Sequence, residues 1–144
     1  MYLLLVAAHS LLRWLVLALA AWATLSAMGG ARDRRAFTRR ARLPGVALSA
    51  VADIQLLLGL SLWLVLSPHA VTSAGRSGYW TFFHPLCGLT VVALVHVGSV
   101  RIRRKLDDAA RWRTAIRFYG AAVAVALVAI PWPFLGTGRP LLPF

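Results

Sequence analysis

The chain has 144 residues (15.7 kDa), the size of one domain, and 60% of them are hydrophobic whereas only 14% are charged. Its net charge is +12, because Lys and Arg number 16 against 4 Asp and Glu, and its mean hydropathy is +0.72. The apolar fraction excludes a disordered chain and an ordinary soluble fold, and the single cysteine excludes an intramolecular disulfide and a multi-cysteine metal site.

Four apolar runs follow one another along the chain, at residues 2–28, 43–66, 80–100 and 114–130. Each run is about as long as a helix that crosses roughly 30 Å of hydrocarbon. The first run lacks a basic region before it and is too long for a cleaved signal peptide. The sequence therefore predicts an all-α fold, a four-transmembrane-helix bundle with up-down topology and short loops, as a single domain over residues 1–144.

Basic residues concentrate in two of the three connecting segments. The segments after the first and third runs, together with Arg117 at the start of the fourth run, hold 13 of the 16 basic residues, whereas Arg76 and Arg139 lie on the opposite side. By the positive-inside rule, the two basic segments are cytoplasmic and both termini lie on the outer side of a bacterial inner membrane. The charge is then chiefly a topology signal, with attraction to anionic lipid headgroups as its second meaning, and no nucleic-acid partner is expected.

Few polar side chains lie within the apolar runs, and each is costly in a bilayer unless it has a partner or a function. A helical rise of about 1.5 Å per residue places His9 about 10 Å and His84 about 6 Å below the outer surface. The same count places Arg13, Gln55 and Asp53 in a deeper layer at about 16 to 20 Å. The sequence therefore predicts an outer pair of histidines above a polar cluster near the middle of the membrane.

His9 and His84 are candidate ligands of a b-type haem, because such a haem takes two imidazoles from two helices at similar depth. Arg13 follows His9 by four residues, so it lies on the same helix face, one turn deeper, where it would meet a haem propionate. Two alternatives remain open at this point. The histidines are interfacial and bonded to loop carbonyls or water, or they belong to a metal, quinone or proton site.

The deeper cluster has a structural interpretation. A buried arginine needs a carboxylate, and Asp53 is the only one inside the apolar runs, so we expect a bidentate ion pair between Arg13 and Asp53 with Gln55 beside it. Haem-propionate binding, quinone binding and a proton relay are the alternatives for this cluster.

His96 stands apart from both layers, at about 24 Å from the outer surface. It follows His84 by 12 residues, and the chain has no other histidine at its depth. The partner of His96 would be Met28 or a residue of a second copy of the chain in a homodimer. The third alternative is that His96 has no partner. The sequence therefore predicts at most one site with two histidine ligands.

Four segments carry a resemblance to a known family: residues 9–14 (HSLLRW), residues 53–63 (DIQLLLGLSLW), residues 84–98 with a histidine near each end, and residues 130–133 (IPWP). In this order and spacing they resemble small bacterial four-helix membrane proteins known as cytochrome b-like proteins. The resemblance covers nearly the whole chain and implies one haem b and electron transfer. The positions that match the motifs of that family are His9, Arg13, Gln55, His84 and His96.

Two functions of different kinds follow from the sequence. The first is an electron-transfer subunit of a larger membrane complex, without enzymatic activity of its own, that binds one haem b through His9 and His84. The second is a cofactor-free accessory subunit that packs against a respiratory or photosynthetic complex, which the short loops and the smooth, alanine-rich fourth run also suit. Copper handling is disfavoured, because two Met and one Cys are too few for a transport path.

Overall fold

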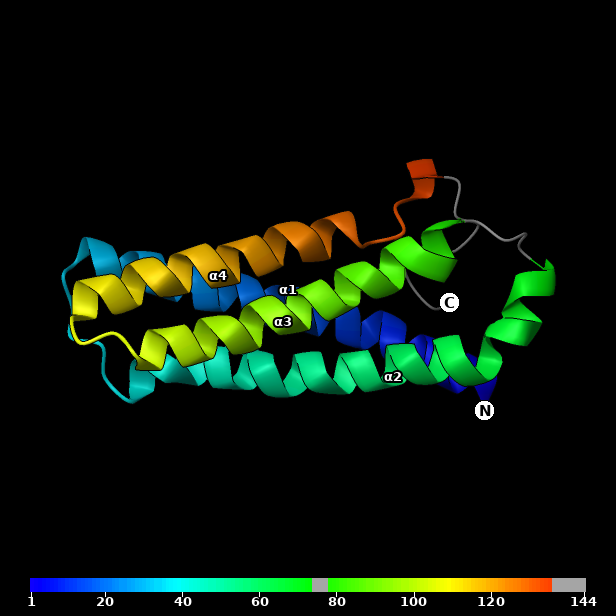
Figure 1. Ribbon diagram of the computed structural model, residues 1–144, viewed down its shortest axis with the longest axis horizontal. Coiled ribbons are helices and arrows are strands. Elements are labelled where there is room, and N and C mark those ends of the chain that lie inside the picture. The colour runs from blue at the N-terminus through cyan, green and yellow to red at the C-terminus, as the bar shows by residue number, and fades with distance from the viewer. Residues whose placement is uncertain (74–77, 136–144) are drawn as a thin grey trace.

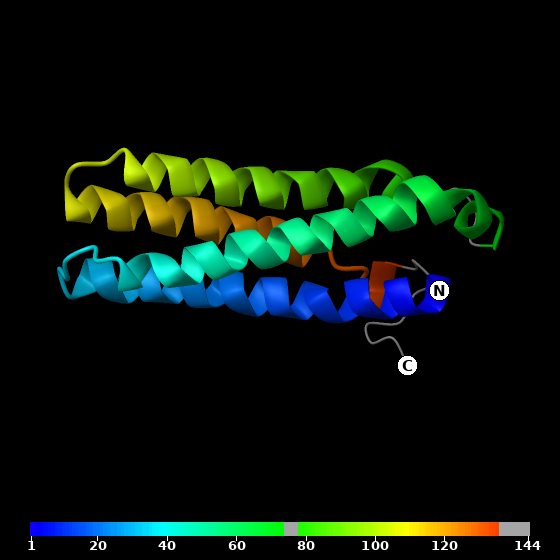
Figure 2. The ribbon, with the colours of Figure 1, turned by 90° about the horizontal axis from the view of Figure 1, so that it is seen from below.

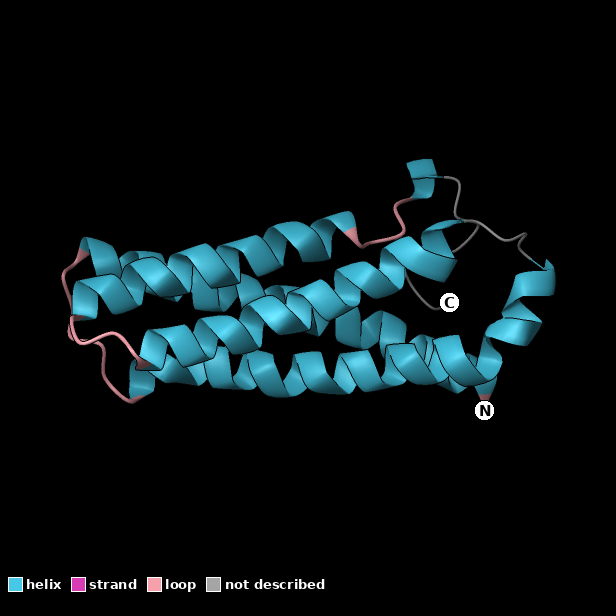
Figure 3. Cartoon of the chain, viewed as in Figure 1, coloured by secondary structure: helices cyan, strands magenta, loops and turns pink. Residues whose placement is uncertain are grey.

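The computed structural model describes the backbone of residues 1–73 and 78–135 and the side chains of residues 1–64 and 78–134. This part of the chain consists of helices joined by loops and has no strand (Figures 1 and 3). The four α-helices are α1 (Tyr2–Arg32), α2 (Leu43–Ser73), α3 (His84–Arg103) and α4 (Asp108–Val128). Short elements flank them: a 3₁₀ turn at Arg40–Arg42, a π-helical turn at Tyr79–Phe83 and a 3₁₀ turn at Pro133–Leu135. The expectation of an all-α fold is confirmed for these residues.

The helices lie side by side and consecutive helices run in opposite directions (Figures 1 and 2). The extensive contacts join α1 to α2 and α4, and α3 to α4 and α2, so α1 and α3 lie on one diagonal of the bundle. Contact between α2 and α3 is the least extensive of the four. Side chains of α1 and α3 can therefore meet only across the bundle interior.

Three helical stretches are long and apolar enough to cross a membrane, namely Tyr2–Arg32, Arg40–Leu64 and Tyr79–Arg103. This identifies the chain as a membrane protein by length and composition. Helix α4 is not among the three, since its first ten residues include four charged side chains. The sequence predicts four spans, and three helical stretches of the structure have the length and apolar character of a span.

Several helix boundaries differ from the expected ones, and α3 covers His84–Arg103 rather than residues 80–100. Helix α1 continues past residue 28 to Arg32, and α2 continues past residue 66 to Ser73. Helix α4 begins at Asp108 rather than at residue 114, because Asp107 caps it. The Asp107 carboxylate accepts two hydrogen bonds of 2.9 Å from backbone N–H groups of the first turn, which would otherwise lack acceptors.

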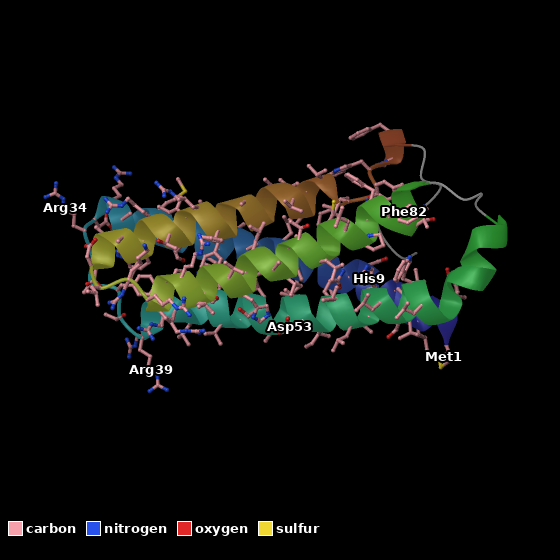
Figure 4. All side chains as sticks on the ribbon, viewed as in Figure 1. Met1, His9, Arg34, Arg39, Asp53 and Phe82 are labelled. Carbon is pink, nitrogen blue, oxygen red and sulfur yellow. The ribbon has the colours of Figure 1, made fainter. Side chains whose placement is uncertain are left out.

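The α1–α2 and α3–α4 connections lie together at one end of the bundle, which we call the basic end (Figures 1 and 4). Arg34 and Arg39 mark this end, whereas Met1 and Phe82 lie toward the other (Figure 4). The two basic segments are thus on one side, as the sequence predicts. The side chains of His69 and Arg76, and the C-terminal segment with Arg139, lie outside the described residues.

Burial divides the bundle into two halves. Among the helical residues whose side chains are described, buried ones occur only from Val16 onward in α1, up to Ala52 in α2, from Val91 onward in α3 and up to Ala122 in α4. We call this part, next to the basic end, the packed half. The remainder of the described helices is the open half, and none of its residues is buried. The packed half therefore holds the core of the bundle.

Small residues build that core. Helix α1 presents Val16, Ala20, Ala23 and Ala27 at alternating spacings of four and three residues, which places them on one face. Small side chains let helix backbones approach closely, which is the usual source of helix association in membranes. Larger side chains complete the core near the basic end, including Trp112, which is 5% exposed.

Candidate functional site

His9 of α1 and His84, the first residue of α3, face each other in the open half. Their ring centroids are 6.0 Å apart and the ring planes are inclined by 69° (Figure 4 labels His9). An iron held by two imidazole nitrogens at about 2 Å each would place the ring centroids about 6 Å apart. The two histidines that the sequence placed at similar depth thus come together across the diagonal of the bundle.

A backbone carbonyl beyond the end of α4 orients His84. The Nδ1 atom of His84 lies 2.9 Å from the Ala129 carbonyl oxygen, and the Tyr79 hydroxyl donates to the same oxygen at 2.7 Å. In a continued helix this carbonyl would accept from the N–H of residue 133, but Pro133 has none. The IPWP segment therefore ends α4 and leaves a carbonyl for the site.

The bond to Ala129 also fixes the chemistry of the His84 ring. Because a carbonyl only accepts, Nδ1 must carry the proton, and in the neutral ring Nε2 is then the basic nitrogen. Metal-bound histidines show the same arrangement, in which the N–H of one ring nitrogen is held by a carbonyl or carboxylate and the other nitrogen binds the metal. His84 therefore has the tautomer of a ligand.

An irregular turn and aromatic rings surround His84. Pro85 cannot donate to the carbonyl four residues earlier, and the chain before it forms the π-helical turn. This turn brings the rings of Tyr79 and Trp80 to 5.8 and 5.4 Å from the imidazole, measured between centroids. His84 is thus held by its neighbours in sequence as well as by α4.

Gln55 and Gly59, one turn apart on α2, hold His9. The Gln55 amide nitrogen donates to the His9 carbonyl oxygen at 3.0 Å and lies 3.3 Å from His9 Nε2. A Cβ atom at Gly59 would lie 3.0 Å from His9 Cε1, so only glycine leaves the imidazole its present place against α2. Gly59 was not among the residues that the sequence singled out, although it follows Gln55 by four residues and so shares its face.

The expected Arg13–Asp53 ion pair is wrong. Asp53 instead pairs with His96, with 2.8 Å between Oδ1 and Nε2, so within the chain the partner of His96 is neither Met28 nor absent. Asp53 and Gln55 are two residues apart and therefore point about 200° apart around α2. Since Gln55 contacts α1, Asp53 faces α3, away from Arg13 (Figure 4 labels Asp53). The Arg13 guanidinium lies 5.3 Å from the Trp14 ring centroid.

The site supports a haem in some respects and resists it in one. The imidazole spacing and the His84 tautomer suit a planar group held by two ligands. The buried Gln55 Oε1 and Trp14 Nε1 atoms have no hydrogen-bond partner among the described residues, so they could serve polar groups of a ligand. The Gln55 amide, however, lies against His9 Nε2, and it would have to turn away before that nitrogen could bind iron.

Among the described residues, no three His, Cys, Asp or Glu side chains form a group that could hold a bare metal ion. A porphyrin supplies four nitrogen ligands of its own, so two histidines complete the coordination of its iron. Two imidazoles on opposite sides are therefore suited to a haem.

Comparisons with known protein families, with curated proteins and with solved structures find no match to this chain.

Proposed function

We propose that this chain is a four-span protein of the bacterial inner membrane that binds one haem b between His9 and His84 and passes electrons within a larger membrane assembly. The observation that supports this most directly is the pair of imidazoles, 6.0 Å apart between centroids, from two helices on a diagonal of the bundle. The resemblance of the sequence to cytochrome b-like proteins points the same way.

The residues around the pair have distinct roles in this proposal. His9 and His84 would hold the haem iron, and Arg13, one turn from His9, would bind a propionate. Gln55 turns from His9 Nε2 to the edge of the bound group. When bound, the haem supplies one-electron transfer, and the protein tunes its potential through the ligands and their hydrogen bonds. The hydrogen bond from His84 Nδ1 to the Ala129 carbonyl oxygen is one bond of this kind.

The topology in this proposal follows from the basic end. Its arginines are cytoplasmic, so the N-terminus and the histidine pair lie toward the outer side, with α4 as the fourth span. The apolar part of α4 after Arg117 is short, and the long side chains of its first turns reach the headgroups from within the membrane. The C-terminus is on the outer side as well.

One spectrum tests the haem. Protein purified from membranes in mild detergent should show a b-type band in the reduced-minus-oxidised spectrum, with about one iron per chain. His9→Ala and His84→Ala should each abolish the band, whereas His96→Ala, which removes a histidine from the packed half, should keep it. A folded, colourless and iron-free protein would overturn the proposal.

The contact of Gln55 with His9 favours a second function, a cofactor-free accessory subunit. In that function the amide is a permanent partner of His9, and the bundle packs against a respiratory or photosynthetic complex. Gln55→Leu distinguishes the two functions. It should destabilise an accessory subunit, because the contacts of Gln55 with His9 are lost, but should leave the b-type band of a haem protein in place or strengthen it.

A further inference from the structure

A cavity of about 390 Å³ lies at the basic end, far from the histidine pair. Its lining residues come from the start of α2 and the end of α3, and from α1 and α4 between them. These two segments overlap in Figure 1 and are seen to be separated at the basic end in Figure 2. The residues that carry the argument are Arg42, Ser49, Ser99, Arg103 and Tyr119, all of which line it. None of them takes part in the function proposed above.

Two arginines from different helices stand at this cavity without a carboxylate. The chain has 4 acidic side chains, and each is engaged elsewhere. The four ion pairs are Asp33 with Arg35, Asp53 with His96, Asp107 with Arg113, and Asp108 with Arg111. Among the described side chains, Arg42 and Arg103 therefore have no anion, and each leaves a planar set of five N–H donors available to one.

The interior of the cavity combines hydroxyl groups with apolar walls. Tyr119 is 7% exposed, and its hydroxyl lies 3.4 Å from the Ser99 hydroxyl. The alanines of α1 and the ring of Trp112 close the inner side. At the mouth, Val46 and Val100 line the cavity and are also 62% and 37% exposed, so they continue it as an apolar surface toward the lipid.

We propose that this cavity binds the phosphate headgroup of an anionic phospholipid. Arg42 and Arg103 bind the phosphate, the hydroxyls of Ser99 and Tyr119 bind the polar part of the headgroup, and the acyl chains follow the surface of Val46 and Val100. Arginine binds phosphate through two parallel hydrogen bonds, and basic pockets between membrane helices on the cytoplasmic side are suited to anionic headgroups. The inference does not depend on the haem.

Binding of phosphatidylglycerol tests the site, measured as a rise in melting temperature of the delipidated protein in detergent at 0.15 M salt or above, where attraction between distant charges is screened. Phosphatidylglycerol should stabilise the protein more than phosphatidylcholine at equal concentration. The variant Arg42→Gln/Arg103→Gln should weaken this binding about tenfold or more, since each basic residue near an anionic headgroup contributes about 1 kcal/mol. Inorganic phosphate and glycerol phosphate show whether the headgroup alone suffices.

The matched control is Arg34→Gln/Arg39→Gln. It removes the same charge from the same end, but neither residue lines the cavity. It should change the affinity by about twofold or less in screened solution. A second variant, Ser99→Leu, fills the cavity without changing the charge and should also abolish the preference for phosphatidylglycerol. Equal effects of the two arginine pairs, or equal stabilisation by both lipids, would overturn the proposal, whereas binding of free phosphate alone would identify a phosphate site rather than a lipid site.

Discussion

The packed half and the open half of the bundle differ in the side chains that lie between the four helices. In the packed half, thirteen buried side chains, mostly small residues with a few large rings, form one continuous cluster, and several of them line the cavity at the basic end. In the open half, histidines, an arginine and a glutamine face inward, and no helical residue is buried. The comparison indicates that burial of side chains next to the basic end contributes most to the stability of the bundle.

Each half nevertheless fixes one key ring through a backbone carbonyl. The Trp112 indole nitrogen donates to the Arg35 carbonyl oxygen at 2.7 Å in the packed half, and His84 Nδ1 lies 2.9 Å from the Ala129 oxygen in the open half. The Trp112 ring also packs against Phe37, with 4.5 Å between ring centroids. The first ring is locked by packing and a hydrogen bond, whereas the second is held by hydrogen bonds and loose aromatic contacts.

The largest effect is expected at Trp112. Trp112→Ala removes a buried ring and its hydrogen bond, and should lower the free energy of unfolding by about 3 to 5 kcal/mol. Trp22→Ala is the control, because Trp22 lies in the same half but is 50% exposed, and its loss should cost about 0.5 kcal/mol or less. Unfolding in mixed detergent micelles, followed by circular dichroism, measures both. Similar losses for the two variants would mean that the packed half is not the source of stability.

Three glycine-to-alanine variants compare the halves directly. At Gly30 the new Cβ would lie 2.5 Å from the locked Trp112 ring, so the variant should lose about 1 to 3 kcal/mol. At Gly59 it would lie 3.0 Å from His9, which the open half lets move, so stability should change less while the haem spectrum shifts. A Cβ at Gly88 would have no atom of another part of the chain within 4 Å, so Gly88→Ala should be neutral or stabilise by up to about 1 kcal/mol. A Gly59 variant as unstable as the Gly30 variant would show that the open half is rigid.

The border between the halves carries the Asp53–His96 pair. Asp53→Ala should lower the free energy of unfolding by about 1 kcal/mol, since both side chains are nearly half exposed and polar contacts in membranes are modest. A double-mutant cycle with His96→Ala should give a measurable coupling energy, and one with Arg13→Ala should give none. The reverse result would restore the ion pair that the sequence suggested.

The smallest effect is expected at Tyr79. Tyr79→Phe removes one of the two hydrogen bonds to the Ala129 oxygen and should cost about 1 kcal/mol or less. Because His84 keeps its own bond to that oxygen, the haem band should remain, with at most a small shift of potential. Thermal unfolding and a redox titration of the same preparation measure the two effects. Loss of the band, as expected for His84→Ala, would show that Tyr79 rather than Ala129 holds the histidine.

The sequence by itself determined the features that depend on position along a helix axis. Length and apolar character predict helices that are long enough to cross a membrane, and the distribution of arginines predicts that the two basic segments share one side. A count of residues from the outer end placed His9 and His84 at similar depth, and the structure brings their rings together. Depth follows from the rise per residue alone, so it requires no knowledge of packing.

The tertiary structure decided which way each side chain faces around its helix. Asp53 lies at a depth from which it could contact either Arg13 or His96. Because α2 is rotated so that Gln55 contacts α1, Asp53 points toward α3 and pairs with His96. The partner of His84 is a backbone carbonyl at the end of another helix, exposed by a proline four residues later, which apolar runs do not reveal. Rotation of a helix about its axis is fixed by the surfaces of its neighbours, and a smooth apolar sequence specifies that rotation only weakly.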